Sequence, residues 1–264
     1  MSAVPKDDQP FLLREDLDGV ATLTLNRPAQ MNLLTSGMLD ALQAAFDAIQ
    51  KDPSVRVVVL AAAGKGFCAG HDLKELRALG EQPKIAELFA RCRAMMMSIQ
   101  GLPQPVIAKV QGPAAAAGCQ LVAQCDLAVA VDSAKFVTSG VTWGFFCSTP
   151  GVAIGRNLQR KHAMEMLLTG EPVDAGRALE WGLVNRVVPA AELDAETAKL
   201  AATLAAKPPA TLAAGKRTFY LQMDMDLTRA YELAGEVIAS SFAHAEGREG
   251  MAAFIEKRPP PGKK

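Results

Sequence analysis

The sequence predicts an α/β fold that is followed by a helical C-terminal region. Through the first two-thirds of the chain, apolar runs typical of strands alternate with stretches whose apolar residues recur at helical spacing. Residues 191–254 are almost wholly helical in pattern. We therefore expect a core over residues 11–190, a C-terminal helical region over residues 191–258, and flexible tails at residues 1–10 and 259–264. A chain of 264 residues suffices for one large domain of this kind.

Strands are expected where apolar residues alternate with other residues or follow one another without a break. Residues 19–25 alternate, as the residues of a half-buried strand do. Continuous apolar runs suit strands that are buried on both faces of a sheet. The further strands that we expect are residues 55–60, 106–110, 127–131 and 184–188.

Helices are expected where apolar residues recur every three or four positions. Leu42, Phe46 and Ile49 do so, and they predict a helix over residues 36–51 that Asp52-Pro53 ends. The same pattern predicts helices over residues 85–100, 161–169 (closed by Gly170), 174–181 (closed by Gly182) and most of 191–254, with a break at residues 207–209.

Composition argues against several classes of partner. Lys and Arg together number 28, as do Asp and Glu, so the overall charge favours neither nucleic acid nor an anionic membrane. No apolar run approaches the roughly 18 residues of a membrane span. Five Cys residues without a CxxC pair suggest neither a metal site nor a disulfide framework. Because the first ten residues are polar and show no export or organelle signal, we expect a cytoplasmic protein.

Two glycine-containing turns, at residues 64–76 and 110–121, each follow an apolar strand and lead into a helical pattern. Small residues allow the backbone to turn tightly and allow a ligand to approach the exposed amides. Two such turns could direct N–H groups at one carbonyl oxygen, which is the arrangement of an oxyanion hole. Ordinary tight turns in an α/β core are the alternative interpretation.

The turns and several other blocks resemble the enoyl-CoA hydratase/isomerase (crotonase) superfamily. The match runs in order from about residue 11 to residue 258. Its blocks are residues 26–28, 66–75, 117–121, 125–126, 134–136, 149–151, 163–170, 182–184, 188–189, 246–247 and 254–258. Within the superfamily, residues 70–76, 116–122 and 146–153 resemble most the branch called enoyl-CoA hydratase domain-containing protein three.

This resemblance implies a crotonase-type ββα spiral, the ClpP/crotonase fold, in which repeated ββα turns form two roughly perpendicular sheets. It also implies a C-terminal helical part that builds a homotrimer or a dimer of trimers. Family members bind an acyl-CoA thioester, so the implied ligand is acyl-CoA, and no cofactor is expected apart from the coenzyme A of the substrate.

By the same resemblance, the thioester oxygen would meet the backbone amides of His71 and Ala117, because fixed N–H groups stabilise an enolate-like intermediate. For His71, a second role as general base stays open. Residues expected to contact the CoA ligand are Arg27, Ala69, Gly70, His71, Asp72, Leu73, Lys74, Ala117 and Lys257, of which Arg27 and Lys257 would hold the nucleotide phosphates.

The chain departs from the family pattern at the two glutamates that hydration requires. One falls on Gln120 and the other on Gly140. Neither residue exchanges a proton. We therefore expect hydratase activity to be weak or absent, and we expect Gln120→Glu together with Gly140→Glu to raise it.

Three functions remain open: a hydratase-like lyase with residual or relocated chemistry, a thioester hydrolase or other acyl-CoA enzyme with a different base, and a non-catalytic acyl-CoA-binding protein. The loop at residues 142–149 resembles a longer version of the family's loop. Its Cys147 and Ser148 are the nearest candidate nucleophiles, although the sequence places no His or carboxylate beside them.

Overall fold

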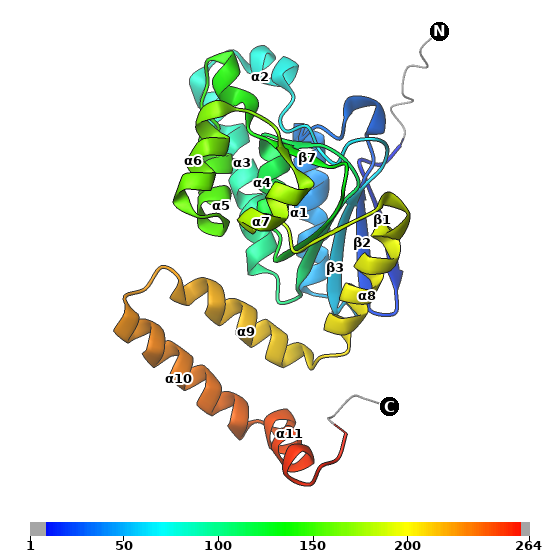
Figure 1. The fold of residues 1–264 in the computed structure, drawn as a ribbon, viewed down its shortest axis with the longest axis vertical. Coiled ribbons are helices and arrows are strands. Elements are labelled where there is room, and N and C mark those ends of the chain that lie inside the picture. The colour runs from blue at the N-terminus through cyan, green and yellow to red at the C-terminus, as the bar shows by residue number, and fades with distance from the viewer. Residues whose placement is uncertain (1–8, 260–264) are drawn as a thin grey trace.

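The computed structural model describes residues 9–259 and contains two β-sheets, helices that cover the larger sheet, and a helical C-terminal part (Figure 1). Residues 1–8 and 260–264, which make up most of the two expected tails, lie outside the described residues. The larger sheet has the spatial order β1 (Leu12–Leu17), β2 (Val20–Leu25), β3 (Val57–Ala62), β4 (Val106–Val110), β6 (Leu127–Val131) and β9 (Arg186–Val188). The smaller sheet contains β5 (Ala114–Ala115), β7 (Lys135–Val137) and β8 (Val173–Asp174).

The helices follow the sequence pattern closely, but three features were not expected from it. They are helix α5, the break between α9 and α10 at residues 223–226, and the break between α10 and α11 at His244. The helices of the body are α1 (Ser36–Gln50), α2 (Leu73–Leu79), α3 (Gln82–Gly101), α4 (Ala117–Gln124), α5 (Ser148–Asn157), α6 (Arg160–Thr169), α7 (Ala175–Trp181) and α8 (Leu193–Ala205). The helices α9 (Pro209–Gln222), α10 (Leu227–Ala243) and α11 (Ala245–Ile255) follow.

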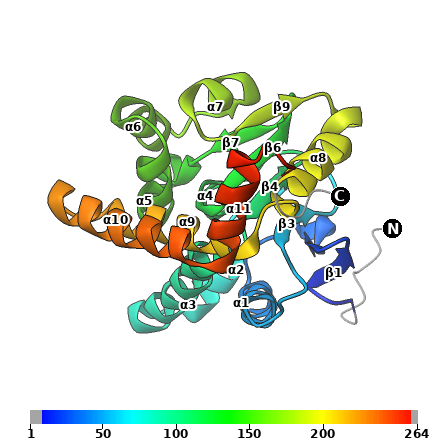
Figure 2. The same cartoon turned by 90° about the horizontal axis from the view of Figure 1, so that it is seen from below.

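The larger sheet is parallel except at its first pair of strands, and helices cover both of its faces. Helix α8 packs on β3, β4 and β6, whereas α1, α3 and α4 lie on the opposite side (Figures 1 and 2). Most of β3 and β4 is buried for this reason, which explains why their sequences are apolar apart from Lys109. Among the described residues, no helix is both long enough and apolar enough to cross a lipid bilayer.

Strand β1 is the strand of the larger sheet that periodicity did not predict, and none of the three strands of the smaller sheet was predicted. Most side chains of β1 are exposed, so it carries no alternating pattern. The turn that joins β1 to β2 consists of Asp18 and Gly19, which have φ angles of 50° and 79°. An Asp-Gly pair with two positive φ angles is typical of a tight antiparallel hairpin, which is how β1 and β2 pair.

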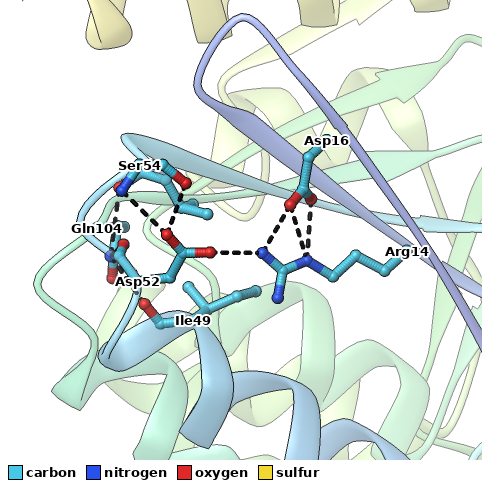
Figure 3. Close-up of polar contacts among 7 residues, drawn as sticks. Arg14, Asp16, Ile49, Asp52, Ser54 and Gln104 are labelled. Carbon is cyan, nitrogen blue, oxygen red and sulfur yellow. Dashed lines mark hydrogen bonds and ion pairs between the residues drawn. The ribbon is translucent and has the colours of Figure 1, made fainter.

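A polar network attaches this hairpin to the turn between α1 and β3 (Figure 3). Arg14 Nη2 donates to Asp16 at 2.7 Å and to Asp52 at 3.0 Å. Asp52 also accepts a hydrogen bond of 2.6 Å from the Ser54 hydroxyl. These hydrogen bonds lower the pKa of Asp52, with those from Ser54 contributing most. The exposed edge of the sheet is thus fixed by polar contacts rather than by apolar burial.

Helices α9, α10 and α11 form a C-terminal arm, residues 209–255, that leaves the body of the molecule (Figure 1). Helix α8, which lies within the expected C-terminal helical region, instead packs on the sheet and buries Leu193, Leu200 and Ala201. The arm is different, because α9 contains no buried residue. Its helices carry large exposed apolar side chains, among them Phe254, which is 86% exposed, and Ile255, which is 77% exposed.

Candidate functional site

The first glycine turn connects β3 to α2, and side chains from two other segments hold it. Asn32, which is fully buried, donates from Nδ2 to the Gly66 carbonyl at 3.0 Å. Gln111 Nε2 donates to the same oxygen at 3.0 Å. Asp72 ends the turn by capping α2, because its Oδ1 accepts a hydrogen bond of 2.8 Å from the Lys74 N–H.

The two turns pack backbone against backbone. The Ala115 N–H donates to the Cys68 carbonyl at 2.8 Å. A Cβ atom at Gly112 would lie 2.0 Å from the carbonyl oxygen of Lys65, and one at Gly118 would lie 2.0 Å from that of Cys68. Side chains are excluded at both positions, so glycine is required there for the turns to meet.

This packing places the backbone amides of His71 and Ala117 on adjoining turns. A Cβ atom at Gly70, whose φ is +88°, would lie 3.1 Å from the Ala117 nitrogen. Ala117 is the first residue of α4, where amides have no acceptor within the helix. Across residues 9–259, no protein group accepts a hydrogen bond from either amide. Two such N–H groups are able to donate to one ligand oxygen.

The residue before Ala117 holds this geometry under strain. Ala116 has φ 49° and ψ −117°, a combination that glycine adopts far more readily than alanine. Its own N–H donates to the Val137 carbonyl at 2.8 Å, which ties the turn to the smaller sheet. Backbone strain of this kind persists only where surrounding contacts determine it, and it is common at functional sites.

The side chain of His71 is held as a neutral group. Its Nδ1 lies 3.2 Å from the Leu34 carbonyl oxygen, and its ring meets Phe89 edge to face with centroids 4.9 Å apart. Burial lowers the pKa of the ring from its ordinary 6.5. The Nε2 atom is buried and has no partner among the described residues. The described contacts of the ring do not involve the second glycine turn, so they give His71 no role beyond that of its backbone amide.

Gln120 lies one helical turn beyond Ala117, so the side chains of the two residues share a face of α4. The residue is 6% exposed, and its Oε1 has no hydrogen-bond partner in the described part of the chain. A buried amide oxygen without a partner is costly, which is typical of a position where water or a ligand supplies the bond. The amide can orient such a group but does not take up a proton from it.

Gly140 lies in a short 3-10 helix, Ser139–Trp143, and the space beside it is filled. A Cβ atom there would lie 2.7 Å from the Phe145 carbonyl oxygen and 2.8 Å from Cys147 Sγ. The loop that follows Gly140 therefore folds back over the position from which a second carboxylate would extend. A Glu at position 140 therefore requires the loop backbone to move, so the gain expected from Gly140→Glu depends on that loop.

Neither candidate nucleophile of this loop is activated. Cys147 is buried, and burial raises the pKa of its thiol. Ser148 is exposed at the start of α5, and its Oγ lies 3.4 Å from the Phe146 carbonyl oxygen. Within the described residues, no His or carboxylate forms a hydrogen bond with either side chain. Nucleophilic catalysis needs such a base, so the geometry does not support it here.

The other expected ligand contacts fall into two groups. Ala69 to Lys74 lie together on the first turn and the start of α2, beside Ala117. The guanidinium of Arg27 stacks on Phe11, with 4.0 Å to the ring centroid, and donates to the Gln9 carbonyl at 2.6 Å. Lys257 is exposed at the far end of the arm. The backbone of Arg27 is linked to the first turn through Asn32, whose Oδ1 accepts a hydrogen bond of 2.8 Å from the Arg27 N–H. No contact of the described residues brings the Arg27 guanidinium or Lys257 to the two turns.

Sequence reasoning missed Asn32 and Gln111, the side chains that hold the first turn. Asn32 has a φ of 52°, which Asn tolerates better than most residues. Its position three residues after the Asn-Arg-Pro-Ala segment gave no apolar or charged pattern to follow.

Across the described residues, no cluster of three or more His, Cys, Asp or Glu side chains is arranged to hold a metal ion.

Sequence and structure comparisons agree on the class of protein that this fold and site define. A family model described as enoyl-CoA hydratase/isomerase matches residues 15–264. The chain belongs to the enoyl-CoA hydratase/isomerase family, and the crotonase fold expected from its motifs is confirmed.

Particular relatives narrow the resemblance to one branch. The chain is 46% identical to enoyl-CoA hydratase domain-containing protein 3 of Xenopus laevis over 95% of this chain and 85% of that protein. The crystal structure of the human protein of that name shares 44% identity, with a TM-score of 0.92 over 96% of this chain and 99% of that one. An enoyl-CoA hydratase structure from Mycobacterium smegmatis shares 53% identity, with a TM-score of 0.93 over 96% and 98%.

These names correct the expected cytoplasmic location. The relatives from Xenopus laevis, human and mouse that carry the domain-containing protein 3 name are all described as mitochondrial. The polar character of residues 1–10 was a poor guide to compartment, because a folded domain does not itself carry an organelle address.

The backbone contact between the turns predicts a large difference between two glycine substitutions. Gly118→Ala should lower the free energy of unfolding by several kcal/mol, since its methyl group would collide with the Cys68 carbonyl. Gly155→Ala in α5 should instead raise it by about 0.5–1 kcal/mol, because no atom lies within 4 Å and alanine favours a helix. Urea unfolding of both variants measures this, and similar effects at the two positions would contradict the packing described.

The environment of His71 predicts a dependence of stability on pH. Its pKa is lower in the folded chain than the ordinary 6.5, so below about pH 6.5 the unfolded chain binds a proton that the folded chain does not. The free energy of unfolding should therefore fall as the pH drops from 7 to 5. His71→Gln should weaken that fall. A pH profile of the variant that runs parallel to that of the wild type would show that His71 is not the group responsible.

Proposed function

We propose that this chain binds an acyl-CoA thioester with its carbonyl oxygen at the amides of His71 and Ala117, and that it hydrates enoyl-CoA poorly. The single observation that carries the proposal is the pair of amides on adjoining turns that donate to no described protein group. Family membership supports the ligand class, since the relatives are named for enoyl-CoA hydratases.

The site suits polarisation of a thioester better than proton transfer. Negative charge that develops on the thioester oxygen would be stabilised by two fixed N–H groups and by the N-terminus of α4. Gln120 can hold a water molecule or a polar ligand atom through its unpartnered Oε1. Hydration also needs a base for the water and an acid for the α-carbon. Neither Gln120 nor Gly140 supplies one.

The nucleotide phosphates of acyl-CoA need basic side chains outside the two glycine turns. Lys257 is exposed beyond the end of α11 and is suited to a phosphate, either in its own subunit or in a neighbouring one. Arg27 is the weaker candidate, because its guanidinium already donates to backbone carbonyls and stacks on Phe11. The proposed contact with the nucleotide phosphates is therefore assigned mainly to Lys257, at the end of the arm.

Self-assembly into a homotrimer or a dimer of trimers is part of the same proposal. Large apolar side chains are exposed along the arm: Phe219, Leu227, Tyr231, Ile238, Phe242, Phe254 and Ile255. A surface this apolar is unfavourable in water and marks a protein interface. Membership of the family, whose resemblance implies assembly through the C-terminal helices, supports further copies of the chain as the partner.

Removal of one amide should weaken binding of an enolate mimic. Ala117→Pro deletes the N–H at the first position of a helix, where proline is otherwise tolerated. Its affinity for acetoacetyl-CoA should fall about 10- to 100-fold, as expected for loss of one hydrogen bond to a charged group. Ala117→Gly, which keeps the amide, is the control. Calorimetric titration that finds equal affinities in folded Ala117→Pro and wild type would exclude this site.

Hydration of crotonyl-CoA should be at least about a thousandfold slower than in a hydratase that has both glutamates. Gln120→Glu should raise the rate, because the carboxylate would meet the group that the amide now holds. Adding Gly140→Glu should give no further gain and should lower stability, since the side chain collides with Phe145. A fast wild-type hydratase that tolerates Gln120→Ala would show that another residue moves the proton.

The exposed arm predicts the size of the particle in solution. Light scattering at micromolar concentration should give the mass of three or six chains of 27.9 kDa. Phe242→Asp together with Ile238→Asp places charge on exposed apolar positions of α10 and should shift the mass toward that of one chain. A wild-type monomer at that concentration would contradict the assembly.

A further inference from the structure

A buried ion pair lies where the arm meets the body. Lys216, on α9, places its Nζ 2.7 Å from Asp126 Oδ2, 2.8 Å from the Ile99 carbonyl oxygen and 3.0 Å from the Gln104 carbonyl oxygen. The side chains of Lys216 and Asp126 are 8% and 14% exposed. An ammonium group has three protons, and here each has an acceptor.

Both oxygens of the Asp126 carboxylate likewise accept hydrogen bonds. The carboxylate accepts hydrogen bonds from the Val106 N–H at 2.7 Å and from the Tyr220 hydroxyl at 2.8 Å, in addition to that from Lys216. Val106 begins β4, and Asp126 comes two residues after the end of α4. We call Lys216, Asp126 and Tyr220 the anchor. It joins the arm to the strand and the helix that support the two glycine turns.

Apolar burial does not fix α9 to the body in the usual way, because no residue of α9 is buried as a whole. Lys216 is the α9 side chain that penetrates the body, and Tyr220 follows it one helical turn later. Apolar contact is non-directional, whereas hydrogen bonds fix both distance and angle. A set of fully paired buried hydrogen bonds thus holds α9 at one place and in one direction.

The position of the anchor links it to the ligand site. Helix α4 begins at Ala117, whose amide lies in the candidate site, and ends at Gln124, just before Asp126. Eight residues of helix span about 12 Å. One short buried helix thus has the thioester site at its first residue and the attachment of the arm just past its last.

We propose that Lys216 and Tyr220 are positioning residues that, through Asp126, set the direction of the arm and thereby place Lys257 for the nucleotide end of acyl-CoA. This inference rests on the proposed function. It applies whether the arm reaches the site of its own subunit or that of a neighbour, because the arm leaves the body at the anchor in either case.

Two probes that differ only at the nucleotide end test the proposal. Butyryl-CoA carries the nucleotide phosphates, and butyryl-pantetheine lacks them. In calorimetric titrations, Lys216→Met should weaken butyryl-CoA binding at least tenfold and change butyryl-pantetheine binding less than twofold. Lys84→Met is the matched control, because Lys84 is 58% exposed and pairs with Glu81 at 3.8 Å on the surface. It should change neither affinity.

Equal losses for both probes, or no loss for butyryl-CoA, would overturn the positioning role. Tyr220→Phe keeps the shape of the anchor and removes one hydrogen bond, so it should give a smaller loss confined to butyryl-CoA. This variant decides the matter if Lys216→Met does not fold.

Hydrogen exchange separates this inference from the proposed function. In Lys216→Met, the amides of α9 to α11 should exchange faster than in the wild type, while those of α1 and β3 keep their rates. If the wild type binds neither probe, the proposed acyl-CoA function fails. Unchanged exchange in the arm would then overturn the anchor as well, whereas selective exchange in the arm would support it.

Discussion

Backbone meets backbone without intervening side chains where the first glycine turn crosses the second. The carbonyls of Lys65 and Cys68 occupy the space that side chains at Gly112 and Gly118 would need. Because the turns touch in this way, the Ala117 amide lies beside Gly70 and therefore close to His71, the residue that follows Gly70. If either turn were displaced by the width of a methyl group, the amides of His71 and Ala117 would move apart. They could then no longer both donate to one ligand oxygen.

The environment of that pair limits the chemistry available. In the proposed site, Gln120 is an uncharged amide whose unpartnered oxygen is left for a ligand or water. Beside Gly140, the Phe145 carbonyl and Cys147 fill the space that a side chain would need, so a carboxylate there would require the loop to move. These features together favour binding and polarisation of a thioester over transfer of a proton.

The body and the arm are stabilised by different physical means. The body buries an apolar core between a parallel sheet and helices on both of its faces. The arm leaves much of its apolar surface exposed and is fixed to the body through paired polar groups, of which Lys216 and Asp126 are the most buried. A directional attachment suits a segment whose apolar face is available to another copy of the chain.

The sequence by itself determined the elements whose pattern is local. The spacing of Leu42, Phe46 and Ile49 predicted α1, apolar runs predicted β4 and β6, and motifs predicted the family and the two turns. Tertiary structure alone decided the contact between the turns, the filled space beside Gly140 and the burial of Lys216. Each of these depends on atoms far apart in the chain, and neither periodicity nor composition records which distant groups will meet.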